Sequence, residues 1–121
     1  MSPAILIVED NSDTNDALVG LLTLRGYNVR GALDGAEALE YLEAGLKPCV
    51  IVLDLRMPTM DGQAFLRVIT EDGRFNRIPV IIYSAVRESV VADMVLANMQ
   101  KGRDPEILLN LIGATWPVSP L

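Results

Sequence analysis

Short, uninterrupted apolar runs recur along the chain and alternate with longer stretches whose apolar residues lie three or four positions apart. The two strongest runs, residues 4–8 and 49–53, contain no polar or charged side chain apart from one cysteine. Such runs are typical of parallel strands that are buried on both faces. Weaker runs of the same kind predict three further strands, at residues 27–30, 80–83 and 95–99.

The stretches between these runs have helical periodicity. Helices are predicted at residues 12–25, 34–44, 63–71 and 104–112. The last of them has Asp104 as its N-cap and Pro105 at its first helical position. A further helix over residues 88–94 is weak, because Val90 and Val91 are β-branched. We therefore expect this fourth helix in chain order to be shortened or irregular.

Alternating strands and helices predict an α/β fold with a parallel sheet that is covered on both faces. Five strands and five helices in 121 residues fit a flavodoxin-like (βα)5 three-layer sandwich with strand order 2-1-3-4-5. We expect one domain over residues 1–121, with its core at 4–113 and a tail at 114–121. In such sheets, ligands bind at the carboxyl ends of the strands, between the first and the third strand.

Charge is distributed unevenly along the chain. Residues 1–62 hold ten acids and four bases, whereas residues 63–121 hold six of each. The chain has no basic patch for nucleic acid, no histidine, and no apolar run near the length of a membrane span. It begins without the pattern of a secretory signal, so we expect it to act in the cytoplasm.

Five side chains with charged or hydroxyl groups follow predicted strands directly or within a few residues. Glu9 and Asp10 come after the first strand, Asp54 after the third, and Ser84 after the fourth. Lys101 lies just beyond the fifth. A single acid at a strand end is more often solvated than functional, but these five side chains are expected to converge at one edge of the sheet.

Three carboxylates at close range would repel one another unless a cation lay among them. Oxygen ligands with room for water and phosphate favour Mg²⁺ over softer metals. A lysine and a hydroxyl group beside them would stabilise the charge of a transferred phosphoryl group, and one carboxylate could act as the nucleophile.

Two motifs resemble those of a known family. Residues 5–11 (ILIVEDN) and 51–62 (IVLDLRMPTMDG) are similar to the receiver domain of two-component response regulators, and the likeness extends over residues 4–113. The resemblance implies that Asp54 is the phosphoacceptor. It also implies that Mg²⁺ is bound by Asp10, Glu9, Asp54 and the main-chain carbonyl of Arg56.

The same resemblance assigns Ser84 and Lys101 to the contacts with the phosphoryl group. The donor would be a sensor histidine kinase or a histidine phosphotransfer protein, and the output would be a changed interaction with an unknown downstream protein. A homodimer is possible under this resemblance, whereas direct nucleic-acid or membrane binding is not expected. The domain would not be an enzyme beyond its own phosphorylation and dephosphorylation.

The second half departs from the family pattern. Lys101 is followed by Gly102 where relatives have a proline in a cis peptide, and Asn98 stands where relatives have an aromatic switch residue. The stretch between Ser84 and Lys101 is also about one helical turn short. We therefore expect no aromatic switching, and hypothesise that phosphorylation orders residues 85–98 instead.

Two other functions compete with a phosphorylated switch. A degenerate receiver would serve only as a protein-interaction or dimerisation module, and the intact carboxylates count against it. A Mg²⁺-dependent phosphohydrolase would need a general acid two residues after Asp54, where this chain has Arg56.

Overall fold

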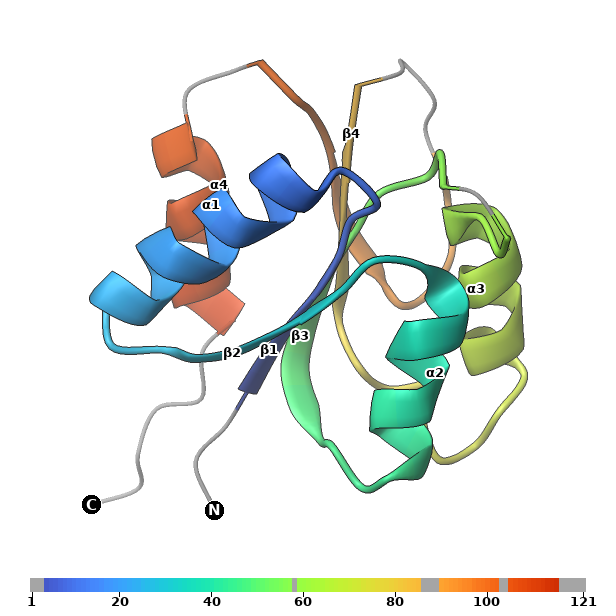
Figure 1. Cartoon of the computed structure of the whole chain (residues 1–121). Coiled ribbons are helices and arrows are strands. Elements are labelled where there is room, and N and C mark those ends of the chain that lie inside the picture. Colours follow the sequence, from blue (N-terminus) through green and yellow to red (C-terminus); the bar gives the residue numbers. More distant parts are fainter. Residues whose placement is uncertain (1–3, 58, 86–89, 103–104, 116–121) are drawn as a thin grey trace.

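A computed structural model describes residues 4–57, 59–85, 90–102 and 105–115, and Figure 1 shows its course. The strands are β1 (Ala4–Val8), β2 (Asn28–Ala32), β3 (Pro48–Leu53), β4 (Val80–Ser84) and β5 (Val95–Gln100). The helices in these ranges are α1 (Ser12–Leu24), α2 (Gly35–Glu43), α3 (Gly62–Thr70) and α4 (Pro105–Thr115).

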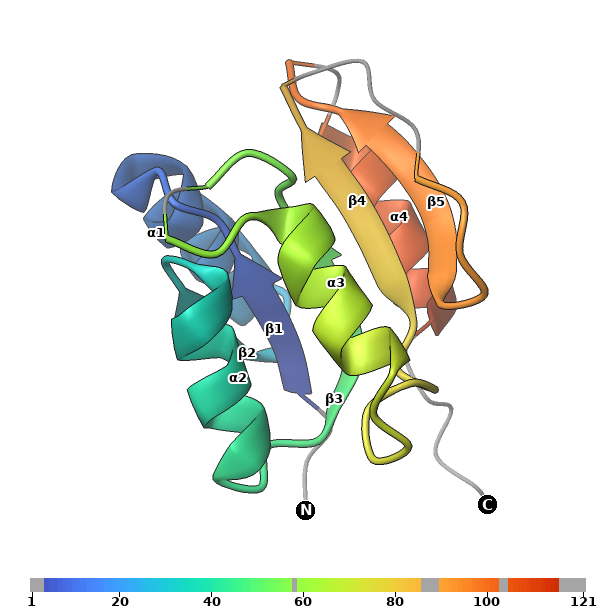
Figure 2. The same ribbon diagram turned by 90° about the vertical axis from the view of Figure 1, so that its right-hand side faces the viewer.

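The strands are all parallel and form one sheet in the order β2-β1-β3-β4-β5. Helices α1 and α4 cover one face of this sheet, and α2 and α3 lie on the other, as Figures 1 and 2 show. The predicted three-layer α/β fold and its strand order are therefore confirmed.

The central strands contribute to two apolar layers at once. On β1, Leu6 and Val8 pack into the cluster beneath α2 and α3, whereas Ile5 and Ile7 pack into the cluster beneath α1 and α4. Because neither face of β1 is exposed to water, the strand has no polar position. This double burial explains why its sequence shows no alternation.

Three helices begin at a side-chain cap. The Oδ1 atoms of Asn11, Asp34 and Asp61 each accept a hydrogen bond from the backbone N–H three residues later, at 2.8 to 2.9 Å. These bonds satisfy N–H groups that have no partner within the first helical turn.

The expectation of a shortened or irregular fourth helix is also confirmed. Of the weak helix predicted over residues 88–94, the described residues 90–94 are not helical; residues 88 and 89 lie outside the described parts. The Asn98 side chain on β5 accepts a hydrogen bond from Val90 N–H at 2.9 Å and donates one to Val90 C=O at 3.1 Å. Both main-chain groups that a helix would need at Val90 are thus bound to β5.

The last helix ends later than the sequence predicts. Helix α4 continues to Thr115, beyond the predicted end at residue 112, while its predicted N-cap Asp104 lies outside the described ranges. Within those ranges, no helix combines the length and the apolar character that crossing a membrane demands.

Candidate functional site

Two carboxylates lie at the carboxyl edge of the sheet, directly after the neighbouring strands β1 and β3. Glu9 N–H donates a hydrogen bond to Ala32 C=O at 3.0 Å, and Asp54 N–H donates one to Val8 C=O at 2.9 Å. The ladder of backbone hydrogen bonds therefore reaches one residue past each strand. It holds the main chain of both acids in place.

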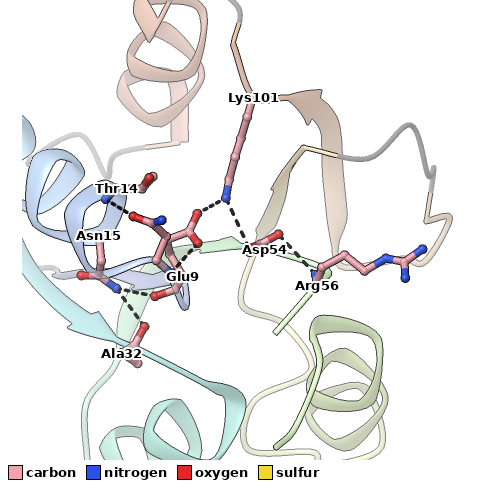
Figure 3. A network of polar contacts seen from close by, with 8 residues as sticks. Glu9, Thr14, Asn15, Ala32, Asp54, Arg56 and Lys101 are labelled. Carbon is pink, nitrogen blue, oxygen red and sulfur yellow. Dashed lines mark hydrogen bonds and ion pairs between the residues drawn. The ribbon is translucent and has the colours of Figure 1, made fainter. Parts of the chain in front are cut away.

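Glu9 is enclosed by the start of α1 (Figure 3). Glu9 is only 2% exposed, and its Oε2 accepts a hydrogen bond from Asn11 N–H at 3.0 Å. A buried carboxylate needs such partners, because removing it from water is costly. The side chain therefore points into the site from a fixed position.

Asn15 supports Glu9 from behind, and the sequence reasoning missed it. Its Nδ2 donates hydrogen bonds to Glu9 C=O at 3.0 Å and to Ala32 C=O at 2.9 Å, which joins β1 to β2 at the edge of the site. The signal in the sequence was a polar residue in register with Leu18 and Leu22 on the buried face of α1.

Lys101 follows the edge strand β5 directly and reaches the two carboxylates from there. Its Nζ forms an ion pair with Glu9 Oε1 and lies 3.3 Å from Asp54 Oδ2 (Figure 3). Its backbone N–H donates a hydrogen bond to Ser84 C=O at 2.8 Å, which fixes the start of the lysine beside the end of β4. The peptide between Lys101 and Gly102 is trans.

The contact between Glu9 and Lys101, together with their burial, shifts the pKa of both side chains. Burial raises the pKa of Glu9 to about 7, against the opposing effect of its hydrogen bonds from Lys101 and Asn11. Burial also acts to lower the pKa of Lys101, but its contacts with Glu9 and Asp54 outweigh burial and leave that pKa raised. The lysine thus stays charged, and it compensates two acids at once.

Asp54 is buried at the end of β3, and its loop is tightly packed. Asp54 Oδ1 accepts a hydrogen bond from Arg56 N–H at 3.3 Å. The Arg56 guanidinium extends away from Asp54 and Glu9 in Figure 3. Gly62 approaches the main chain here, because a Cβ added to it would lie 2.1 Å from Asp54 C=O.

Asp10 completes a group of three acids. One carboxylate oxygen each from Glu9, Asp10 and Asp54 lie within 4.8 Å of one another, with Asp10 exposed and the other two buried. Hard carboxylate oxygens this close together, with one of the three acids exposed to water, suit a divalent cation such as Mg²⁺. The donor set therefore fits the metal that the sequence predicted.

Ser84 is the remaining predicted side chain. It is buried at the end of β4, where its backbone carbonyl is joined to Lys101. The structure therefore brings Glu9, Asp10, Asp54 and Lys101 together, and it places Ser84 at the same edge of the sheet. The phosphoryl- and metal-binding roles assigned to these residues and to the Arg56 carbonyl all stay predictions.

A protein-family model matches most of this chain. The model of the response regulator receiver domain matches residues 5–104. The chain belongs to this family. Receiver domains are signalling domains, and the acidic pocket of this receiver is complete, which speaks against a degenerate member of the family.

Longer proteins contain similar receivers. The transcriptional regulatory protein PrrA of Mycobacterium tuberculosis is 37% identical over 116 residues, which cover 92% of this chain and 47% of PrrA. Hybrid signal transduction histidine kinase D of Dictyostelium discoideum is 33% identical over 79% of this chain and 6% of its own length. The receiver thus spans about half of PrrA and a small part of the kinase.

Solved structures share the fold. Response regulator TrrA from Thermotoga maritima, in complex with Mg²⁺ and BeF, has a TM-score of 0.81 at 22% identity, covering 93% of this receiver and 98% of TrrA. A sensor protein from Polaromonas sp. JS666 has a TM-score of 0.81 at 26% identity, covering 93% of this receiver and 95% of that chain.

Proposed function

We propose that this receiver accepts a phosphoryl group on Asp54 from a histidine kinase or a histidine phosphotransfer protein, in a Mg²⁺-dependent reaction. The observation that carries the proposal is the position of the Asp54 carboxylate. Its Oδ2 lies 3.3 Å from the ammonium group of Lys101, and the carboxylate is grouped with those of Glu9 and Asp10.

The transfer would be a nucleophilic displacement. One carboxylate oxygen of Asp54 forms a bond to phosphorus while the bond from phosphorus to the histidine nitrogen of the donor breaks. The bonding electrons of that second bond stay on the imidazole. Because β1 and the loop that ends at Gly62 hold Asp54 in place, its carboxylate is oriented before the donor arrives.

The carboxylates of Glu9, Asp10 and Asp54, with the main-chain carbonyl of Arg56, would hold Mg²⁺. The cation would neutralise negative charge on the phosphoryl oxygens as they approach the acids. Lys101 would then exchange its contact with Glu9 for one with a phosphoryl oxygen. The Ser84 hydroxyl would donate a hydrogen bond to another.

Partners are proposed from the same chemistry. A histidine donor is supported by the histidine kinase among the relatives, and the three grouped acids of the site would hold the cation that the transfer requires. The phosphorylated form would alter the affinity of the receiver for a downstream protein, because new charge at the sheet edge changes which contacts are favourable.

The test is acyl-phosphate formation, followed by intact mass. Wild type, Asp54→Asn and Asp61→Asn are incubated with acetyl phosphate, with Mg²⁺ or with EDTA. Asp61→Asn is the matched control, since it makes the same change a few residues away and asparagine also caps helices. We expect one phosphoryl adduct in wild type and in the control, only with Mg²⁺, and none in Asp54→Asn.

No adduct in wild type would contradict the proposal and favour an interaction module. An adduct that persists in Asp54→Asn would contradict the assignment of the acceptor. Steady hydrolysis of varied phosphate esters would instead indicate a phosphohydrolase.

A further inference from the structure

A hollow of about 390 Å³ lies on the surface between α3 and the segment that leads into β5. It is lined by Gln63, Leu66, Arg67, Thr70, Glu71, Val90, Val91 and Ala92. Figure 2 shows β4 and β5 passing between these two walls, with no helix drawn in front of them. None of the residues that line the hollow belongs to the acidic pocket, and the proposed reaction does not use them.

The wall opposite α3 is fixed to the sheet. Asn98 on β5 binds both main-chain groups of Val90 through its amide. The turn that follows is closed by a hydrogen bond from Val95 N–H to Ala92 C=O at 2.9 Å. Residues 90–92 are therefore held against β5 and form the second wall of the hollow.

The α3 wall has the spacing of a helix-packing face. Four lining residues of α3 and its C-cap Glu71 are separated by three, one, three and one positions, so they follow one stripe over about two helical turns. Two valines add exposed apolar surface nearby: Val91 is 96% exposed and Val68 is 41% exposed. A helix laid along this stripe would cover both the lining residues of α3 and the exposed valines.

Charges on the stripe identify the helix that fits. Arg67 and Glu71 are exposed and lie about one turn apart. Neither side chain takes part in an ion pair with another of the described residues. A second α3 helix running antiparallel, with the two-fold axis at the level of Ile69, would place each arginine opposite the glutamate of the other copy.

We propose that two copies of this chain associate through α3 and the 90–92 wall, with two reciprocal Arg67–Glu71 ion pairs and the exposed valines between them. Asp54 does not line this surface, so the unphosphorylated Asp54→Asn variant should dimerise like unphosphorylated wild type. Because the patch is small and its ion pairs are exposed, the dissociation constant is micromolar or weaker and rises with salt.

The test measures the dissociation constant of the purified chain by analytical ultracentrifugation at up to about 1 mM. Arg67→Glu and Glu71→Arg should each raise that constant about tenfold or more, since two attractions become two repulsions. Mixing the two variants in equal amounts should restore the wild-type affinity as a heterodimer, because two glutamates then face two arginines. Arg77→Glu is the control for reversing an exposed charge elsewhere.

A second pair of variants tests the apolar part. Val91→Ser should weaken the dimer, whereas Leu24→Ser, which alters an exposed leucine at the end of α1, should not. The melting temperature of each variant reports whether the fold is kept.

Three results would overturn the proposal. One is a wild-type chain that stays monomeric over the whole concentration range. Another is a dimer that Arg67→Glu and Val91→Ser leave unchanged. The third is a failure of the mixed variants to regain the affinity that each has lost.

Discussion

Strands β3 and β5 belong to the same sheet, but their surroundings differ. β3 pairs with β1 on one side and β4 on the other, and all of its residues except Cys49 are buried. β5 pairs with β4 alone, and none of its six residues is fully buried. The acidic pocket takes its proposed nucleophile from the end of β3 and its lysine from just beyond β5.

This difference matches what each side chain has to do. A carboxylate has a short side chain, so its position depends almost wholly on its backbone, and β3 is the better-fixed strand. Lys101 has a long flexible stem that can carry its charge to the site from a less constrained edge. The chain therefore tolerates an open β5 without losing the geometry around Asp54.

The largest contrast is expected in the stability lost when a leucine is shortened on each of the two strands. Leu53→Ala on β3 should lower the free energy of unfolding by about 3–4 kcal/mol, because it leaves a cavity in a fully buried position. Leu96→Ala on β5, where leucine is 52% exposed, should cost less than about 1 kcal/mol. Urea denaturation measures both, and similar losses would show that β5 is as constrained as β3.

The loop after β3 should be nearly as intolerant. Gly62→Ala would push a Cβ against the main chain of Asp54 and Leu55, which we expect to cost about 3 kcal/mol. Gly73→Ala is the matched control, since a Cβ there meets no atom within 4 Å. A well-folded Gly62→Ala protein with wild-type stability would contradict the tight packing behind the nucleophile.

Removing the lysine tests how the two strands meet. Lys101→Met leaves the buried Glu9 without its charged partner, which should cost about 1–3 kcal/mol in EDTA. Saturating Mg²⁺ should remove most of that cost, because a bound cation replaces the ammonium charge. Lys47→Met, which removes an exposed lysine, is the control. An equal cost with and without Mg²⁺ would argue against a cation at Glu9.

The smallest effect is expected at the two hydrogen bonds that join the Asn98 side chain on β5 to the main chain of Val90. Asn98→Ala removes two exposed hydrogen bonds to Val90, so we expect a loss of about 1 kcal/mol or less. Amide exchange at Val90 should speed up in Asn98→Ala. It should speed up less in Asn98→Asp, which keeps the acceptor of the first bond. Unchanged exchange in both variants would mean that the hydrogen bonds from Asn98 do not hold the segment around Val90.

Much of the fold was predictable because its signals are local. Residues 4–8 and 49–53 are buried on both faces, and their apolar runs say so directly. The convergence of Glu9, Asp10, Asp54 and Lys101 followed from parallel strand direction alone. Asn15 was missed because a polar residue on a helix reads as a surface position until the carbonyls that it binds are known.

The sequence by itself determined the alternation of strands and helices, the strand order and the residues at the carboxyl edge. Each of these depends on periodicity or on the order of elements along the chain. Only the tertiary structure decided that Asn98 binds Val90, that α3 faces an open hollow, and that Lys101 bridges Glu9 and Asp54. These features join residues distant in sequence through single side chains, and no pattern along the chain records such pairings.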